Sequence, residues 1–81
     1  MSYHLKKIEK GKIGEFSKIR EEFEELTDAV EQSDKVLQIC ELTDLIGAIE
    51  LFADLHFGLS INDLKKFSDK TQNSFLSGKR K

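Results

Sequence analysis

One long stretch decides the fold of this chain: DKVLQICELTDLIGAIELFADLHF, residues 34–57. Apolar side chains cover most of its circumference when they are placed at about 100° per residue on a helical wheel. They are Val36, Leu37, Ile39, Leu42, Leu45, Ile46, Ala48, Ile49, Leu51, Phe52, Ala53 and Leu55. The pattern predicts one long helix with more apolar surface than a single neighbouring helix can cover. We therefore expect an all-α fold, a bundle of about three helices per chain that is completed by oligomerisation.

Two acidic side chains, Glu41 and Asp44, interrupt the apolar stripe of this helix. Because they are one helical turn apart, both carboxylates lie on the same helix face. Acidic side chains are rarely buried unless they are paired or bind a metal ion. Glu50 and Asp54 lie on the polar side of the helix and are expected to be solvated. Glu41 and Asp44 are therefore candidate metal ligands.

A second helix is predicted upstream, over residues 13–31. Its core stripe repeats at helical intervals through Phe16, Ile19, Phe23, Leu26 and Val30. A flanking stripe of charged side chains borders that core: Glu15, Lys18, Glu22 and Glu25. The other glutamates lie farther round the helix and are expected to be solvated: Glu21, Glu24 and Glu31. Glu22 and Glu25 thus form a second pair of carboxylates one turn apart.

The two pairs of carboxylates are expected to meet. The connection between the helices is short, and short connections produce antiparallel neighbours. Counted from residues 32–33, Glu25 and Glu41 lie at almost equal distances along the chain. Glu22 and Asp44 are also nearly level, with a mismatch of about one residue, or about 1.5 Å of rise.

Four converging carboxylates would repel one another and raise one another's pKa unless a cation neutralised them. Salt bridges to Lys18 or Arg20 are one way to neutralise them. A metal ion is the other, and ligands that are all oxygen favour Mg²⁺, with Mn²⁺ as a substitute.

Capping residues divide the rest of the chain. Ser33 is a candidate N-cap for the long helix, and Gly58 is its expected C-terminal stop. Ser60 and Asp63 resemble a capping box that opens a third helix. That helix carries Ile61, Leu64, Phe67, Thr71 and Phe75 at helical spacing. It should end near residues 77–78.

Composition limits the function classes. The 81 residues are expected to form a single domain, 1–81, with a flexible basic arm at 1–12 and a basic tail at 77–81. A net charge of −2 argues against a nucleic-acid partner. We also expect no membrane association, because no stretch is apolar for long enough to span one. The lone Cys40 suits a small core position and a reducing, cytoplasmic compartment.

The two histidines are not part of either acidic pair. His56 is expected to flank the end of the long helix, and His4 to be solvated, with a role in a ligand pocket left open. A di-iron carboxylate bundle is not favoured, because that class uses Glu-x-x-His pairs.

The acidic motif has a recognisable form: Glu21-Glu22-x-x-Glu25, fifteen residues, then Glu41-x-x-Asp44. With its flanks at residues 14–19, 41–50 and 71–78, the chain resembles the MazG-like, all-α nucleoside triphosphate pyrophosphohydrolases. It is similar to the small stand-alone members of bacteria and their phages, over essentially its whole length.

The resemblance implies Mg²⁺-dependent hydrolysis of a (deoxy)nucleoside triphosphate to the monophosphate and pyrophosphate, in nucleotide pool control or house-cleaning. It also implies a homodimer or homotetramer. The implied metal ligands are Glu22, Glu25, Glu41 and Asp44, with Glu21 and Glu22 as catalytic residues and Lys18, Lys70 and Asn73 as substrate contacts. The alternative is a non-catalytic helical dimer that binds a nucleotide or a protein.

Overall fold

The computed structural model describes the backbone of residues 4–76 and the side chains of residues 4–73. Three α-helices follow one another: α1 (Phe16–Glu31), α2 (Lys35–Phe57) and α3 (Ile61–Leu76). No strand occurs between residues 4 and 76, so the predicted all-α fold is confirmed. None of the described helices is long and apolar enough to cross a membrane. The predicted basic tail, residues 77–81, lies outside the described residues.

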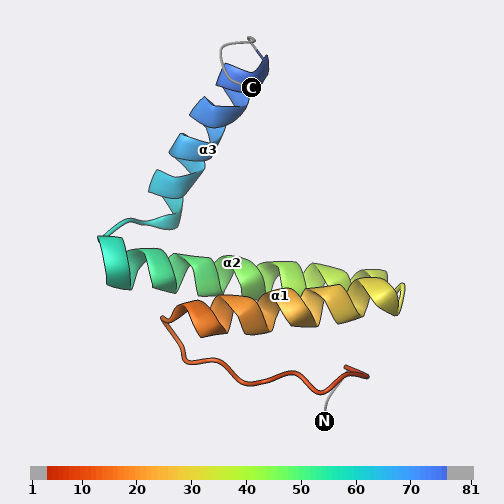
Figure 1. Cartoon of the computed structure of the whole chain (residues 1–81). Coiled ribbons are helices and arrows are strands. Elements are labelled where there is room, and N and C mark those ends of the chain that lie inside the picture. The colour runs from red at the N-terminus through yellow and green to blue at the C-terminus, as the bar shows by residue number, and fades with distance from the viewer. Residues whose placement is uncertain (1–3, 77–81) are drawn as a thin grey trace.

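Helices α1 and α2 lie side by side as an antiparallel hairpin (Figure 1). Ser33, the expected N-cap, instead takes the left-handed backbone conformation, with φ of 58°, that reverses the chain. The cap is Asp34, whose side chain accepts a hydrogen bond from the Leu37 amide at 3.0 Å. The prediction was wrong by one residue because the turn itself uses Ser33.

The start of α1 also differs from the expected Ile13. Gly14 has a φ of 85°, which is outside the helical range, and the Glu15 amide closes a turn onto the Lys12 carbonyl at 2.9 Å. The helix therefore begins only at Phe16.

The end of α2 follows the sequence prediction. Gly58 caps it in the left-handed conformation, with φ of 66°, and its amide donates to the Asp54 carbonyl at 3.0 Å. The capping box of α3 is also confirmed. The Ser60 amide donates to the Asp63 carboxylate at 2.9 Å, and the Asp63 amide donates to the Ser60 hydroxyl at 3.1 Å. Within residues 4–76, α3 contacts α2 but not α1, and it projects away from the hairpin (Figure 1).

The hairpin buries few apolar side chains. Those that are buried in the described part are Ala29, Leu37, Ala48 and Ala53. The core stripe expected on α1 is not a core within one chain, because Phe16, Phe23 and Val30 are all more than half exposed. Cys40, also expected in the core, is exposed. The reason is that α1 turns its acidic face inward and leaves its apolar face outward.

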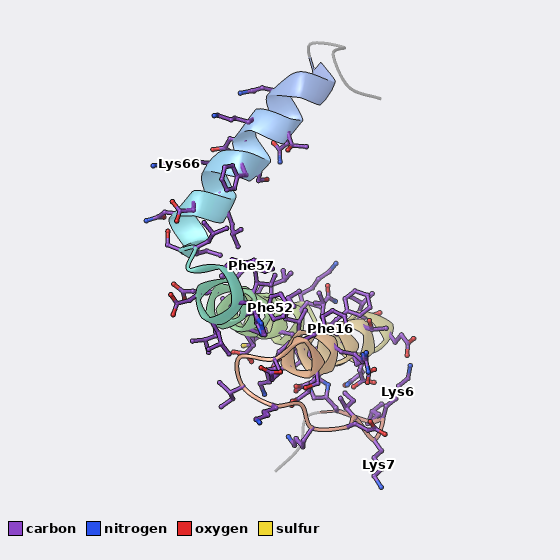
Figure 2. All side chains as sticks on the ribbon, turned by 60° about the vertical axis from the view of Figure 1, so that its left-hand side comes forward. Lys6, Lys7, Phe16, Phe52, Phe57 and Lys66 are labelled. Carbon is purple, nitrogen blue, oxygen red and sulfur yellow. The ribbon has the colours of Figure 1, made fainter. Side chains whose placement is uncertain are left out.

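Many large apolar side chains of the three helices are consequently exposed. They are Phe16, Phe23, Val30, Val36, Ile39, Leu42, Ile46, Leu51, Leu55, Phe57 and Phe67. The end of α2 adds a ring cluster in which the Phe52 and Phe57 centroids lie 6.0 Å apart. Figure 2 shows this cluster between the hairpin and α3, while Lys6 and Lys7 lie on the arm beyond α1.

Exchanging Gly58 for alanine should lower the free energy of unfolding by about 1 kcal/mol, because a Cβ disfavours the left-handed conformation. No atom within 4 Å would meet that Cβ, so the loss would come from the backbone alone. The matched control is Gly47→Ala, inside α2, where a Cβ also meets nothing within 4 Å. This substitution should raise the free energy of unfolding by about 0.5–1 kcal/mol. Urea denaturation measures both, and equal effects at the two positions would contradict the assignment of Gly58 as the cap.

Candidate functional site

Carboxylates from both helices converge in the middle of the hairpin. Glu22, Glu41 and Asp44 each offer an oxygen within 4.8 Å of those of the other two. Glu22 also groups in this way with Glu21 and Glu25, so the structure brings together all four acids that the level argument paired. Glu22 and Glu41 are only 5% and 4% exposed. Asp44 is exposed, unlike the stripe position expected for it, because it borders an open groove.

One buried oxygen of this cluster accepts no hydrogen bond from the described residues. Glu22 Oε2 is buried and has no hydrogen-bond partner within the described part of the chain. Leaving a buried carboxylate oxygen without a partner is costly, so such an atom calls for a ligand. The donor set around it is all oxygen, which fits a hard divalent cation.

His4 is the first functional candidate that sequence reasoning placed wrongly. It was expected to be solvated, with a role in a ligand pocket left open, but its ring reaches into the cluster from the extended segment before α1. Its Nε2 lies 2.6 Å from Glu41 Oε2 and 3.1 Å from Glu25 Oε2, and its Nδ1 lies 2.9 Å from Asp28 Oδ2. The ring thus bridges acids of α1 and α2.

Asp28 is a second residue of the site, and it was not predicted from the sequence. It is 2% exposed and accepts hydrogen bonds from the Leu5 amide at 3.1 Å and from Gln32 Nε2 at 2.8 Å, in addition to its contact with His4. A signal was present in the sequence, because Asp28 continues the three-residue spacing of Glu22 and Glu25 along one face.

Glu21 was expected to be solvated and is instead 3% exposed. The arm, residues 4–12, passes over it, and the Gly11 amide donates to Glu21 Oε1 at 2.7 Å. A Cβ on Gly11 would lie 2.3 Å from the Ser17 carbonyl oxygen, so the close approach requires glycine. Burial opposes ionisation, but the Gly11 amide and the Lys18 ammonium outweigh it and lower the pKa of Glu21. The arm therefore packs on α1 through this carboxylate.

Lys18 contacts both Glu21, the carboxylate on which the arm packs, and Glu22, a candidate metal ligand. Its Nζ lies 3.1 Å from Glu21 Oε1 and 3.1 Å from Glu22 Oε1. It also faces an open groove of about 410 Å³ that runs beside Asp44. The groove is lined by Ile13, Lys18, Glu22, Thr43, Asp44, Gly47, Ala48 and Leu51. Acids, one cation and an apolar wall therefore border a single space.

The other expected substrate contacts do not reach this space within one chain. Lys70 and Asn73 are exposed on α3, which does not contact α1 in the described part. The reason is the break at Gly58, after which α3 leaves the hairpin (Figure 1).

The carboxylates of the cluster differ in their affinity for protons. Burial, followed by repulsion from Glu22 and Glu41, raises the pKa of Glu25 to about 7. Burial also raises the pKa of Glu41, against the opposing effect of His4. Burial disfavours the charged ring of His4, but its hydrogen bonds to Asp28 and Glu41 raise its pKa overall. Without a metal ion, the cluster therefore retains protons near neutral pH.

The comparisons with known proteins agree with this picture. Residues 1–64 match the family model described as phosphoribosyl-ATP pyrophosphohydrolase. The chain belongs to this family. The match covers the arm, α1, α2 and the beginning of α3, and it confirms the MazG-like resemblance. No curated protein and no solved structure matches the chain significantly. Membership makes the chain a pyrophosphohydrolase, a hydrolase that acts on an acid anhydride in a nucleotide-like substrate.

The cluster predicts a pH dependence of stability. The pKa of Glu25 is higher folded than unfolded, so its contribution is present below about pH 4.5 and is lost as pH rises to about 7. The raised pKa of His4 adds a further loss at higher pH. The pKa values of Glu21 and Asp28 are lowered, so their contributions to stability are lost as the pH falls rather than as it rises. That loss occurs only in acid.

The melting temperature of the metal-free chain should therefore fall by at least about 4 °C between pH 5 and pH 8, equivalent to about 1 kcal/mol. Adding Mg²⁺ at pH 8 should restore it. Calorimetry in EDTA and in Mg²⁺ measures the effect, and Glu25→Gln should flatten the pH dependence. A melting temperature that rises with pH in EDTA would contradict the assignment.

Proposed function

We propose that the chain hydrolyses a (deoxy)nucleoside triphosphate to the monophosphate and pyrophosphate in a reaction that requires Mg²⁺. The observation that carries the proposal is the buried carboxylate of Glu22, one oxygen of which has no partner in the described part of the chain, beside Glu41 and Asp44 at the edge of a groove. Family membership supports the class of reaction. Control of a nucleotide pool, or removal of damaged nucleotides, is the role that we propose for it.

The residues fit the cation. Glu22, Glu25, Glu41 and Asp44 would hold it, since Glu22 groups with Glu41 and Asp44 and also with Glu25, and one oxygen of Glu22 has no partner among the described residues. Mg²⁺ in such a site supplies neutralisation of phosphate charge and polarisation of the phosphorus–oxygen bond. Mn²⁺, with similar ligand preferences, would substitute.

Lys18 is the proposed phosphate contact. Its ammonium borders the groove next to Glu22, so a phosphate beside the metal candidates would meet it. The apolar end of the groove, at Ala48 and Leu51, offers a wall for a base or sugar. The family resemblance implies that Glu21 is a catalytic residue, which assists the metal ligands or positions the attacking water. Because its Oε1 already accepts from Gly11 and Lys18, we propose instead that it orients Lys18.

A second substrate, phosphoribosyl-ATP, is favoured by one observation, the description of the matching family model. Its triphosphate would present the same anhydride to the same acids, so the proposed roles of the residues are unchanged. The two substrates differ in the bulk attached to the base, and only a direct comparison of turnover separates them.

The apolar surface supports a further element of the proposal, a homodimer or homotetramer. The exposed apolar residues lie along all three helices, and each would be covered by helices of a second copy. A second copy would also give α3 a surface to pack on. Lys70 and Asn73 of α3 would then reach a site of the partner chain, which is the role that we propose for them.

Pyrophosphate release tests the enzyme. With Mg²⁺ and a panel of ribo- and deoxynucleoside triphosphates plus phosphoribosyl-ATP, the wild type should release pyrophosphate, and EDTA should abolish release. Glu41→Gln should lower kcat at least about 100-fold, because it removes a ligand charge while preserving the side-chain shape.

The matched control is Glu50→Gln, an exposed glutamate of the same helix, which should leave kcat unchanged. Release that persists in EDTA would overturn the metal requirement. A folded wild type that hydrolyses no member of the panel would favour the alternative, a non-catalytic helical module that binds a nucleotide or a protein.

Sedimentation velocity tests the assembly. Phe23→Glu should weaken self-association at least about 100-fold, because it would place a charge in the apolar contact surface. Phe23 is 58% exposed in the single chain, so the substitution should not unfold it. Glu24→Lys, at the adjacent exposed position, is the control and should associate as the wild type does. A wild type that sediments as a monomer at high concentration would refute the assembly.

A further inference from the structure

We propose that His4, Glu25 and Glu41 form a second metal site, which takes a transition ion such as Co²⁺, Mn²⁺ or Zn²⁺ in preference to Mg²⁺. The proposed function assigns no role to His4, which comes from the arm before α1. The inference extends the proposed Mg²⁺ site, with which it shares Glu25 and Glu41, and rests on it to that extent. Its test measures metal binding rather than turnover.

The donor atoms already have nearly the required separations. His4 Nε2 lies 3.1 Å from Glu25 Oε2 and 2.6 Å from Glu41 Oε2, and the three residues offer atoms within 4.8 Å of one another. With metal–ligand bonds of about 2.1 Å, adjacent donors in an octahedral shell lie about 3 Å apart. The first separation matches this value, and the second needs only a small widening as the ion replaces the proton at Nε2.

The other side of the ring is built as a metal-binding histidine requires. A histidine ligand usually donates its second N–H to a carboxylate, which fixes the tautomer and the ring orientation. Here Nδ1 lies 2.9 Å from Asp28 Oδ2. Asp28 is itself held by the Leu5 amide and by Gln32, so the ring is oriented by a buried, fixed acceptor. The imidazole of His4 thus lies between the carboxylate of Asp28 on one side and those of Glu25 and Glu41 on the other. A surface ion pair has no such arrangement.

The buried oxygen of Glu22 that carries the Mg²⁺ proposal lies beside the second site. It belongs to the same cluster, since Glu22 and Glu25 offer oxygens within 4.8 Å of each other, and it is buried without a partner in the described residues. Even with the Lys18 ammonium paired to Glu22, the ionised carboxylates of this cluster carry more charge than one divalent ion balances: Glu22, Glu25, Asp28, Glu41 and Asp44.

The chemistry of the donors decides between ions. Imidazole nitrogen suits borderline metals, whereas Mg²⁺ prefers oxygen ligands and water. The Asp44 side of the cluster is all oxygen and the His4 side is mixed, so the two sides should select different ions.

Cobalt is the probe, because Co²⁺ bound to protein ligands absorbs visible light. The full chain, carrying Cys40→Ser so that the exposed thiol does not contribute, is titrated with Co²⁺ and, separately, with Mg²⁺. His4→Gln should weaken Co²⁺ binding at least about 10-fold and change the visible spectrum, with Mg²⁺ affinity within twofold of its parent. The matched control is His56→Gln, at an exposed histidine of α2, which should change neither.

A second measurement does not depend on a variant that folds. In long-range ¹H–¹⁵N spectra, Zn²⁺ should shift the Nε2 resonance of His4 and leave both nitrogens of His56 in place. Equal Co²⁺ affinity with and without His4, or a Zn²⁺ titration that leaves Nε2 unshifted, would overturn the inference. Neither readout uses a nucleotide, so failure here is distinguishable from failure of the proposed hydrolysis.

Discussion

Burial of negative charge at the centre of the α1–α2 hairpin is the constraint on which the rest of this structure depends. Glu21, Glu22, Asp28 and Glu41 are all nearly inaccessible to solvent, in a chain that buries few apolar side chains. Buried carboxylates persist only where positive charge or hydrogen-bond donors compensate them. The donors include Lys18 and Gln32, and the arm contributes an imidazole and two backbone amides. The arm is therefore part of the fold, although it contains no regular secondary structure.

The same constraint explains why the apolar faces point outward. A helix that carries an acidic stripe and an apolar stripe can turn only one of them toward its neighbour. In α1 the acidic stripe faces α2, so Phe16, Phe23 and Val30 remain for another surface. Turning the acidic stripe inward suits a binding site, because the paired acids then lie on two rigid helices whose spacing is fixed by backbone packing. It leaves much of the apolar stabilisation of the chain to contacts beyond the hairpin.

Local patterns in the sequence predicted much of this. The long helix, its glycine stop and the capping box of α3 follow from residues close together in the chain, where periodicity and capping chemistry act directly. The convergence of Glu22, Glu25, Glu41 and Asp44 followed from a short connection and equal counting on both sides of it. Local reasoning failed where a segment without periodicity decides the outcome. The burial of Glu21 and the position of His4 depend on how residues 4–12 cross α1, and the sequence alone does not reveal that path.

One oxygen atom links the arm to the edge of the groove. Glu21 Oε1 accepts from the Gly11 amide of the arm and from Nζ of Lys18, which borders the groove. An anion that draws Lys18 away would leave more of this oxygen's negative charge for the amide, and so would tighten the arm. Thermodynamic linkage requires the reverse as well, because any change that loosens the arm at Gly11 alters the affinity of the groove for anions by the same factor. Glu21 thus offers a path of two hydrogen bonds between the arm and the groove, beside the close approach of Gly11 to the backbone at Ser17.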